Sequence, residues 1–425
     1  MWPVLIRFQG LAARILAKGD KSLAKAAGLG ILPGFQGEFS YQWLKIFTWW
    51  SWGPGQAGLS VALLDKADFP RPKLCGGMVS GRGLKALDAI FGARPDDALV
   101  LVGQQVAWLW RGEELARFKA PYPLWFTGRY SFDHDLQQKA LAAGAADYSA
   151  RRWCDLDLEA GQIHLDGGEV LGFRALIAAD GATSPIAARL FGRAFDPDKI
   201  GFTLEAECQR PEAGEPLMEV DFRAVPWGYG WKFPKRDSLT VGVGGLHSEN
   251  PDLRPALEAL MPEGCTSSKV KGAFLPLGDF RCDPTFGNVL FVGDAAGLVD
   301  PMTGEGIAYA LESGALAAQA VAKALAAGEV AGAGAAYRHA LADIHDDLTQ
   351  ALRLRRYAYA RFFSKVFRQK LEKSEWSRQA FFDLLEGKRS YRDLQAEVTA
   401  RLQSAGIIGK LGQAMLTWPE RRAGR

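Results

Sequence analysis

The chain has 425 residues, of which 48% are hydrophobic and 23% charged, and its formal net charge is +3. This is the composition of an ordinary globular protein of two or more domains, and no apolar run reaches the ~18–20 residues of a membrane-spanning helix. The five cysteines are scattered and odd in number, so we expect no disulfide framework and a reducing, cytoplasmic location; the five isolated histidines show no metal-ligand spacing, so no metal site is predicted.

The first 56 residues do not have the pattern of a folded domain. Read one base earlier, the codons of Trp49-Trp50-Ser51-Trp52 and the residues after them permit a run of valines followed by Gly-Ala-Gly-Pro. Such a sequence is typical of a buried parallel strand leading into a glycine-rich phosphate loop. We therefore predict that residues 1–56 are out of frame or non-native and that native sequence begins near Ala57. A transit peptide is a less favoured alternative for the basic residues 1–41.

The next segment lacks an expected helix. Residues 53–58 match the G-x-G-x-x-G pattern, but an apolar strand, Leu59–Leu64, follows at once and ends at Asp65. A parallel βαβ crossover needs at least about 10–12 residues, so we infer that the crossover helix is missing. Asp65 stands where a carboxylate can bind the hydroxyls of an adenosine ribose.

Three further features precede residue 198. Paired glycines follow Cys75, and they allow the backbone to approach a flat ligand; the cysteine is either a packed residue or a reactive thiol. The segment Arg129–Asp133 introduces a helix predicted over residues 136–145. An apolar strand is predicted over residues 170–179, and it ends in a tight turn at Asp180.

Residues 198–275 change to an alternating pattern, as in Leu239–Val243, which predicts an antiparallel sheet inserted as a second domain. Within it Tyr229, Trp231 and Phe233 occupy every second position. Because successive side chains of a strand point to opposite faces, these three aromatics are predicted to share one face.

A strand over residues 289–292 precedes a glycine-rich helix start. Asp294 follows the strand and can accept hydrogen bonds from polyol hydroxyls. Gly304 and Gly306 leave uncovered the N-terminus of a helix that is predicted to run to about Ala327, so its amides and positive dipole can face a negative ligand. The alternative is a glycine-rich helix start that binds nothing.

Residues 331–425 are predicted to be helical, and basic and aromatic side chains alternate between Arg353 and Arg378. Such helices can lie on an anionic membrane surface, or they can pack their aromatics on the core and expose a basic face. Both alternatives stay open. Nucleic-acid binding is not expected, because no recognition motif accompanies the charge.

Together these motifs resemble the geranylgeranyl reductase family of flavoproteins, which has the p-hydroxybenzoate hydroxylase type of FAD fold. The most specific likeness is Tyr229–Lys235, which resembles the family's Y-x-W-x-F-P-K signature. The resemblance implies an α/β protein: a Rossmann-like FAD-binding domain with a damaged first βαβ unit, an inserted antiparallel β-sheet substrate domain and a helical C-terminal region. The expected limits are 57–197 and 276–330 for the FAD-binding domain, 198–275 for the substrate domain and 331–425 for the C-terminal region.

The resemblance also implies an FAD-dependent oxidoreductase that reduces carbon–carbon double bonds of a prenylated small molecule or lipid. Cys75 would supply the proton, and NAD(P)H or a ferredoxin would supply the electrons. The implied FAD-binding residues are Asp65, Cys75, Gly76, Gly77, Arg129, Asp180, Gly293, Asp294, Gly304, Gly306 and Ile307. The implied substrate-binding residues are Tyr229, Trp231 and Phe233.

Two other interpretations stay open at this point. One is a flavin monooxygenase or halogenase on the same fold. The other is a non-catalytic product of a pseudogene or faulty gene model. Since no helix stands behind the loop that should hold the pyrophosphate, we expect the chain as written to bind FAD poorly or not at all.

Overall fold

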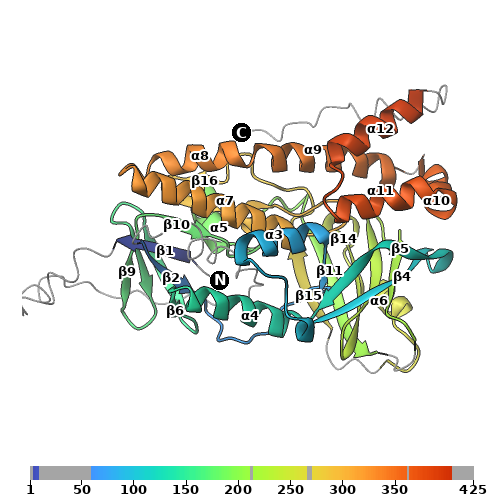
Figure 1. Ribbon diagram of the computed structural model, residues 1–425, viewed down its shortest axis with the longest axis horizontal. Helices are drawn as coiled ribbons and strands as arrows, with labels where there is room; N and C mark the ends of the chain where they lie inside the picture. The colour runs from blue at the N-terminus through green and yellow to red at the C-terminus, as the bar shows by residue number, and fades with distance from the viewer. Residues whose placement is uncertain (1–2, 9–58, 211–213, 266–269, 361–362, 404–425) are drawn as a thin grey trace, which may run out of the picture.

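The computed structural model describes residues 3–8, 59–210, 214–265, 270–360 and 363–403. In the described part, a six-stranded sheet and an eight-stranded sheet lie at opposite ends of the molecule, and long C-terminal helices run along one side of both (Figure 1). None of the described helices is long and apolar enough to cross a membrane. The α/β fold class predicted from the sequence is confirmed.

The six-stranded sheet carries the strands that lead to the predicted cofactor residues. Its order is β16 (Thr285–Phe286), β17 (Val289–Phe291), β10 (Leu176–Ala178), β1 (Pro3–Phe8), β2 (Leu59–Leu64) and β6 (Ala146–Tyr148). β10 pairs with β17 and β2 with β6 in parallel, as expected of a Rossmann-like sheet. Its strands are completely buried where β10 meets β17, so continuous apolar runs suit them.

Strand β1 occupies the centre of this sheet but runs opposite to both neighbours. Pro3 pairs with Ala178 of β10, and Phe8 pairs with Leu59 at the beginning of β2. The chain therefore leaves β1 at the edge where the parallel strands begin, so this strand does not lead directly into a loop at their carboxyl ends. Residues 9–58, including the glycine-rich segment, lie outside the described residues, and the prediction that 1–56 are non-native stays a prediction.

The eight-stranded sheet forms the second layer of the molecule. Its order is β15 (Lys271–Leu275), β11 (Gly201–Gln209), β14 (Ser238–Leu246), β13 (Gly228–Pro234), β12 (Leu217–Phe222), β4 (Val100–Trp110), β5 (Glu113–Thr127) and β3 (Met78–Val79). All neighbours are antiparallel except β4 and β12, which pair in parallel. The antiparallel sheet predicted for residues 198–275 is present and is extended by three strands from residues 78–127.

A small third sheet explains one wrong prediction. The apolar run 170–179 was expected to be one strand, but it forms β9 (Val170–Gly172) and β10 in different sheets. β9 joins β7 (Trp153–Asp157) and β8 (Gln162–Leu165). The backbone N–H of Phe173 donates to the carbonyl of Gly161, so the chain leaves one sheet before it enters the other. Apolar continuity alone does not show such a change.

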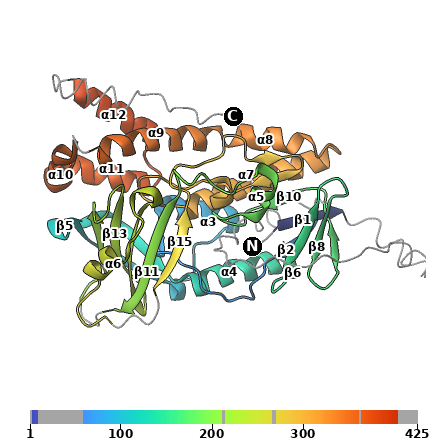
Figure 2. The same ribbon diagram turned by 180° about the vertical axis from the view of Figure 1, so that it is seen from behind.

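The described helices lie on more than one side of the sheets: those after residue 306 run along the side nearest the C-terminus, whereas the helix at residues 129–142 lies on the opposite side (Figure 1). The helices are α3 (Gly81–Phe91), α4 (Arg129–Ala142), α5 (Pro185–Phe191), α6 (Arg254–Leu260), α7 (Ile307–Ala326), α8 (Gly332–Ala340), α9 (Ala342–Tyr359), α10 (Ser364–Lys373), α11 (Glu375–Leu385) and α12 (Tyr391–Gln403). Short 3₁₀ turns are η2 (Asp97–Leu99), η3 (His247–Glu249) and η4 (Gly293–Ala296). The view from behind shows α6 on the outer face of the eight-stranded sheet (Figure 2).

The C-terminal helices pack aromatic side chains into the protein. Phe382 of α11 and Leu371 of α10 join a buried cluster around Trp108 of β4. In the basic segment, Tyr359 and Phe363 are buried, whereas Arg368 forms an exposed ion pair with Glu113. For these described residues the arrangement favours the interpretation of a cap that exposes its basic face. Contact with a membrane surface stays a prediction.

Two cysteines do form a disulfide, so the expectation that the scattered cysteines are unpaired was wrong for them. Cys208 of β11 bonds to Cys265, which lies 57 residues later in the loop after α6. Their Cα atoms are 5.5 Å apart because α6 packs back on β11 and β14. Sequence spacing does not reveal a pairing that depends on tertiary folding. The cytoplasmic location stays a prediction.

Candidate functional site

One cavity brings together the segments that the sequence singled out. It lies where the Lys73–Met78 segment, strands β11 and β13 and the Pro301–Ile307 segment meet. Of the predicted residues, Cys75, Gly76, Gly77, Tyr229, Trp231, Phe233, Asp294, Gly304, Gly306 and Ile307 line it. Segments more than 200 residues apart in the chain therefore share one hollow. Asp65, Arg129, Asp180 and Gly293 lie outside this lining.

The Cys-Gly-Gly turn is pinned between two strands. Gly77 has φ +87° and its carbonyl accepts from the N–H of Thr127; a Cβ at this position would lie 2.2 Å from the Thr127 carbonyl oxygen. A Cβ on Gly76 would lie 2.9 Å from the Phe233 ring. Only glycines allow this approach, because any side chain would collide with backbone or ring atoms.

Behind this turn lies a buried set of charges. Asp133 accepts from Nε and Nη2 of Arg129 at 2.6 and 2.9 Å, and Arg71 lies 3.6 Å from the same carboxylate. Although burial acts to raise it, the attraction of Arg129 and Arg71 lowers the pKa of Asp133. Burial, assisted by the charge of Arg129, lowers the pKa of Lys73 to about 8. The side chain of Cys75 lies beside Arg129 and packs against the cluster of α3.

The aromatic wall of the cavity has the predicted alternation. The ring centroids of Tyr229 and Trp231 are 5.5 Å apart, and those of Trp231 and Phe233 are 6.4 Å apart. Lys232, between them, points the other way and pairs with Glu219 at 2.9 Å. The Tyr229 hydroxyl donates to the Thr303 carbonyl and so ties the wall to the helix start.

The opposite wall is the loop before α7. Asp300 holds this loop by accepting from the N–H groups of Met302 and Thr303, and the Tyr391 hydroxyl donates to it at 2.6 Å. Gly304 has φ +71°, and a Cβ on it would lie 2.8 Å from the Tyr229 hydroxyl. Gly306 precedes α7 and carries no side chain to cap the helix N-terminus.

Two acids of this region were not singled out by the sequence. Glu305, between the two glycines, hydrogen-bonds to Ser80, and burial raises its pKa to about 7. Glu205 of β11 lines the cavity, and burial raises its pKa to about 7 as well. The signal for Glu205 is available in the sequence: in the alternating strand 201–209, Thr203, Glu205 and Glu207 share one face.

The three predicted aspartates follow strands of the six-stranded sheet. Asp65 follows β2 and is buried, and its carboxylate accepts from the Ala67 N–H and from Arg71 Nε. Asp180 follows β10; Oδ2 accepts from the Ile186 N–H, and burial raises its pKa to about 6. Asp294 follows β17 and reaches the cavity. The carboxyl edge of the sheet thus gathers all three, as the general rule for such sheets requires.

The cavity has the features that a flat, polar-edged ring such as the flavin of FAD requires. Its walls approach so closely that only glycine is accepted at Gly76 and Gly304. Two buried donors nearby, Nε1 of Trp231 and Nη1 of Arg129, have no hydrogen-bond partner among the described residues. The residues of the flavin half are therefore of the kind that would hold the group, and the cavity between them measures about 140 Å³ in this structure. The segment that would bind the pyrophosphate lies outside the described residues, and the expectation of poor FAD binding stays a prediction.

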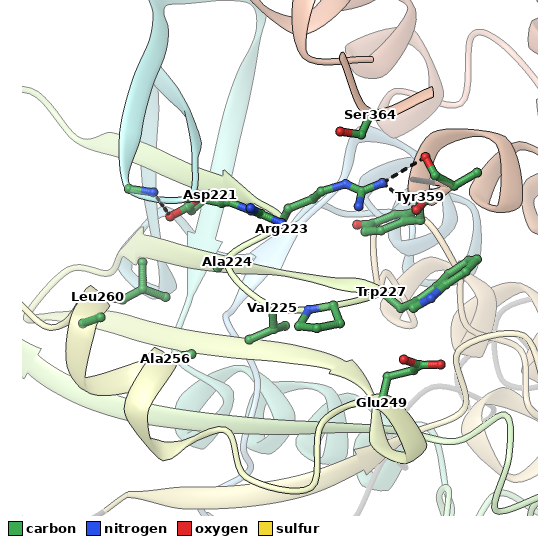
Figure 3. A pocket seen from close by; sticks show the side chains of 15 residues that line it. Asp221, Arg223, Ala224, Val225, Trp227, Glu249, Ala256, Leu260, Tyr359 and Ser364 are labelled. Atoms are coloured by element: carbon green, nitrogen blue, oxygen red, sulfur yellow. Dashed lines mark hydrogen bonds between the residues drawn. The ribbon is translucent and has the colours of Figure 1, made fainter. Parts of the chain in front are cut away.

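A second cavity of about 910 Å³ adjoins the first (Figure 3). Trp227 and Tyr359 line both cavities, and their rings stack with centroids 5.9 Å apart and planes 16° apart. Arg223 reaches across Figure 3 to the end of α9 and donates to the carbonyl of Tyr359 at 2.5 Å. This contact holds Tyr359 in place, so the stacked pair forms the partition between the two cavities.

No protein-family model matches the chain, but comparisons with individual proteins find relatives and a shared fold. Menaquinone reductase of Mycobacterium tuberculosis is 31% identical over 301 residues, which cover 62% of this chain and 71% of that protein. Digeranylgeranylglycerophospholipid reductase 1 of Methanopyrus kandleri is 31% identical over 306 residues, which cover 65% and 77%. The solved structure of a geranylgeranyl bacteriochlorophyll reductase-like protein from Thermoplasma acidophilum has the same fold, with a TM-score of 0.64, 20% identity and coverage of 84% and 93%.

Proposed function

Because the chain belongs to the geranylgeranyl reductase family of FAD-dependent oxidoreductases, we propose that it reduces carbon–carbon double bonds of an isoprenoid chain. The observation that supports this most directly is the shared cavity of the Cys75–Gly77 turn, the aromatic face of β13 and the glycine-flanked start of α7. Its aromatic wall offers an apolar surface to a prenyl chain beside the slot that suits a flat ring.

Different described residues are expected to bind the cofactor and the substrate. FAD, when bound, supplies the hydride. We expect Asp65, Asp180 and Asp294 to hold its polar parts, and the α7 N-terminus with its positive dipole to favour negative charge near Gly306. Trp231 and its two aromatic neighbours orient the prenyl chain and exclude water. The resemblance gives the proton to Cys75, and this stays a prediction.

The substrate is a prenylated small molecule or lipid, and the electrons come from NAD(P)H or a ferredoxin. The apolar wall recognises the chain itself, and one wall residue, Tyr229, is fixed by its bond to Thr303. A headgroup-independent preference for the prenyl chain is therefore expected.

A single-turnover experiment tests the proposal. The purified protein, loaded with FAD and reduced with dithionite without oxygen, is mixed with geranylgeranyl lipids of different headgroups. The expected product gains two hydrogens for each reduced double bond, as read by mass spectrometry. Trp231→Ala should raise the prenyl-substrate concentration that gives half of the maximal single-turnover rate, whereas Lys232→Gln, on the other face of the same strand, should not. Reduced, FAD-loaded protein that leaves every prenyl chain unsaturated would contradict the proposal.

Two outcomes identify the competing interpretations. An oxygenated or halogenated product formed on admission of oxygen and halide identifies a monooxygenase or halogenase. A folded protein that takes up no FAD at any concentration supports the non-catalytic interpretation. A purified protein that carries one FAD per chain contradicts the expectation of poor binding.

A further inference from the structure

The carboxyl group of Glu205 occupies a position in the cavity that the family resemblance does not assign. Strand β11 alternates: Phe202, Leu204 and Ala206 pack on its outer face, whereas Thr203 and Glu205 face the cavity. Only 7% of Glu205 is exposed. A buried acid is costly unless it is paired or has a function, so its placement requires an explanation.

The surroundings of Glu205 hold the carboxyl in one place. The backbone of Cys75 lies near the carboxyl and favours its charged form, so Glu205 stands beside the turn that faces the ring slot. On the neighbouring strand β14 the residue opposite is Gly242, where a Cβ would lie 2.3 Å from the Trp231 indole. The missing side chain lets Trp231 lie against the strand beside Glu205. The carboxyl is therefore at the junction of the cofactor turn and the aromatic wall.

The charges around this carboxyl come from several elements. Lys73 precedes the turn, Lys235 follows β13, and Lys271 lies opposite Glu205 on β15. Glu207 lies on the same face of β11 and bonds to Lys235 at 2.6 Å, and Tyr229 lies on the aromatic wall. Burial outweighs the attraction of the lysines and raises the pKa of Glu205 to about 7. A substantial fraction of this carboxyl is therefore protonated at neutral pH.

We propose that Glu205 is the catalytic acid that protonates the alkene carbon while the neighbouring carbon receives the hydride. The inference rests on the proposed function. The π bond of the alkene breaks and two C–H bonds form: one takes the hydride and its two electrons from the reduced cofactor, which is oxidised. The other takes the proton from Glu205, and the resulting carboxylate regains a proton from solvent. Glu207, next along the same face, is exposed to solvent.

This assignment replaces the one that the resemblance gives to Cys75, because the other proton carriers of the cavity are less suitable. The side chain of Cys75 packs against the cluster of α3 and lies beside Arg129. The hydroxyl of Tyr229 already donates to the Thr303 carbonyl, and burial raises its pKa further above the ordinary value. Glu305 bonds to Ser80 at the start of α3. Three described acids line the cavity: Asp294 follows β17 of the six-stranded sheet, Glu305 bonds to Ser80, and Glu205 lies on β11 opposite Gly242, against which Trp231 packs.

The decisive experiment compares three variants in single turnover with the FAD-loaded, reduced protein. Glu205→Gln should lower the rate constant of prenyl reduction by about 10²-fold or more, since general acids contribute ~10²–10⁴-fold. The substrate concentration that gives half of its maximal single-turnover rate, and its FAD affinity, should stay near wild type. The wild-type rate should fall as pH rises through about 7, because the acid must be protonated, and the residual rate of Glu205→Gln should lack this inflection. Glu207→Gln and Cys75→Ala, the matched controls, should retain the inflection.

A second measurement does not depend on turnover. Infrared difference spectra of the protein, titrated across pH 7, should contain a carboxyl C=O band that is present in wild type and Glu207→Gln but absent in Glu205→Gln. If wild type turns over and Glu205→Gln is equally fast, the assignment of Glu205 fails but the proposed function stands. The same holds if Cys75→Ala, and not Glu205→Gln, loses the inflection. A wild-type protein that shows the band yet reduces no prenyl chain would overturn the proposed function, and the catalytic assignment with it.

Discussion

Replacing Asp133 by asparagine should destabilise the protein far more than breaking a comparable ion pair at the surface. The Asp133 carboxylate is 1% exposed, accepts two hydrogen bonds from Arg129 and lies near Arg71. Asparagine keeps the volume but removes the counter-charge of the buried Arg129, whereas Arg71 keeps its ion pair with Asp65. Removing one partner of a buried pair costs about 3–5 kcal/mol, so we expect a loss of that size in the free energy of unfolding.

Glu114→Gln is the matched control, because Glu114 makes an equivalent two-point contact with Arg117 while both side chains are largely exposed. Solvent screens this pair, so the expected loss is below about 1 kcal/mol. Urea unfolding at a fixed FAD concentration measures both values. The reasoning about burial is refuted if Asp133→Asn costs no more than Glu114→Gln.

The pH dependence of the same variant gives an independent check. The pKa of Asp133 is lowered in the folded protein because, despite burial, Arg129 and Arg71 attract the carboxylate. The unfolded chain therefore binds the proton at a higher pH than the folded one. The stabilisation by this carboxylate is fully present above about pH 4, which is the ordinary pKa of an aspartate in the unfolded chain. It is lost as pH falls through the lower pKa of Asp133 in the folded protein. The difference between wild type and Asp133→Asn should shrink below about pH 4.

Three other substitutions have definite expected outcomes. Gly304→Ala should weaken FAD binding in a fluorescence titration, because the residue has φ +71° and its Cβ would lie 2.8 Å from the Tyr229 hydroxyl; unchanged affinity would contradict the tight-wall description. Tyr391→Phe leaves the buried Asp300 without one donor and should cost about 1–3 kcal/mol in urea unfolding, whereas no change would show the bond is dispensable. Burial raises the pKa of Asp180 to about 6, and a raised acid pKa makes the stability of the folded protein fall as pH rises from 4 to about 6. Asp180→Asn should remove this decline in the free energy of unfolding. A decline that persists in the variant would belong to another group.

The features that the sequence predicted well are those with a local physical signature. Leu59–Leu64 forms the predicted strand, and alternation placed Tyr229, Trp231 and Phe233 on one face. The meeting of the Cys75–Gly77 turn with the start of α7 could be expected only through the family resemblance. No periodicity brings together segments separated by more than 200 residues.

The features that were missed depend on packing between distant segments. Glu205 gains its surroundings from the Cys75 backbone and from Lys235, so its alternating position alone did not mark it. The bond between Cys208 and Cys265 exists because α6 folds back on the sheet. Strands β4 and β5 join the antiparallel sheet through the parallel pairing of β4 with β12. No turn sequence predicts this pairing, because the two strands are not consecutive in the chain.

The direction of β1 has a topological consequence. Its last residue, Phe8, and the first residue of β2, Leu59, lie side by side. A connection between antiparallel neighbours begins and ends at the same edge of a sheet, as in a hairpin, however long it is. The handedness rule that makes parallel crossovers right-handed therefore places no constraint on how the chain passes from β1 to β2.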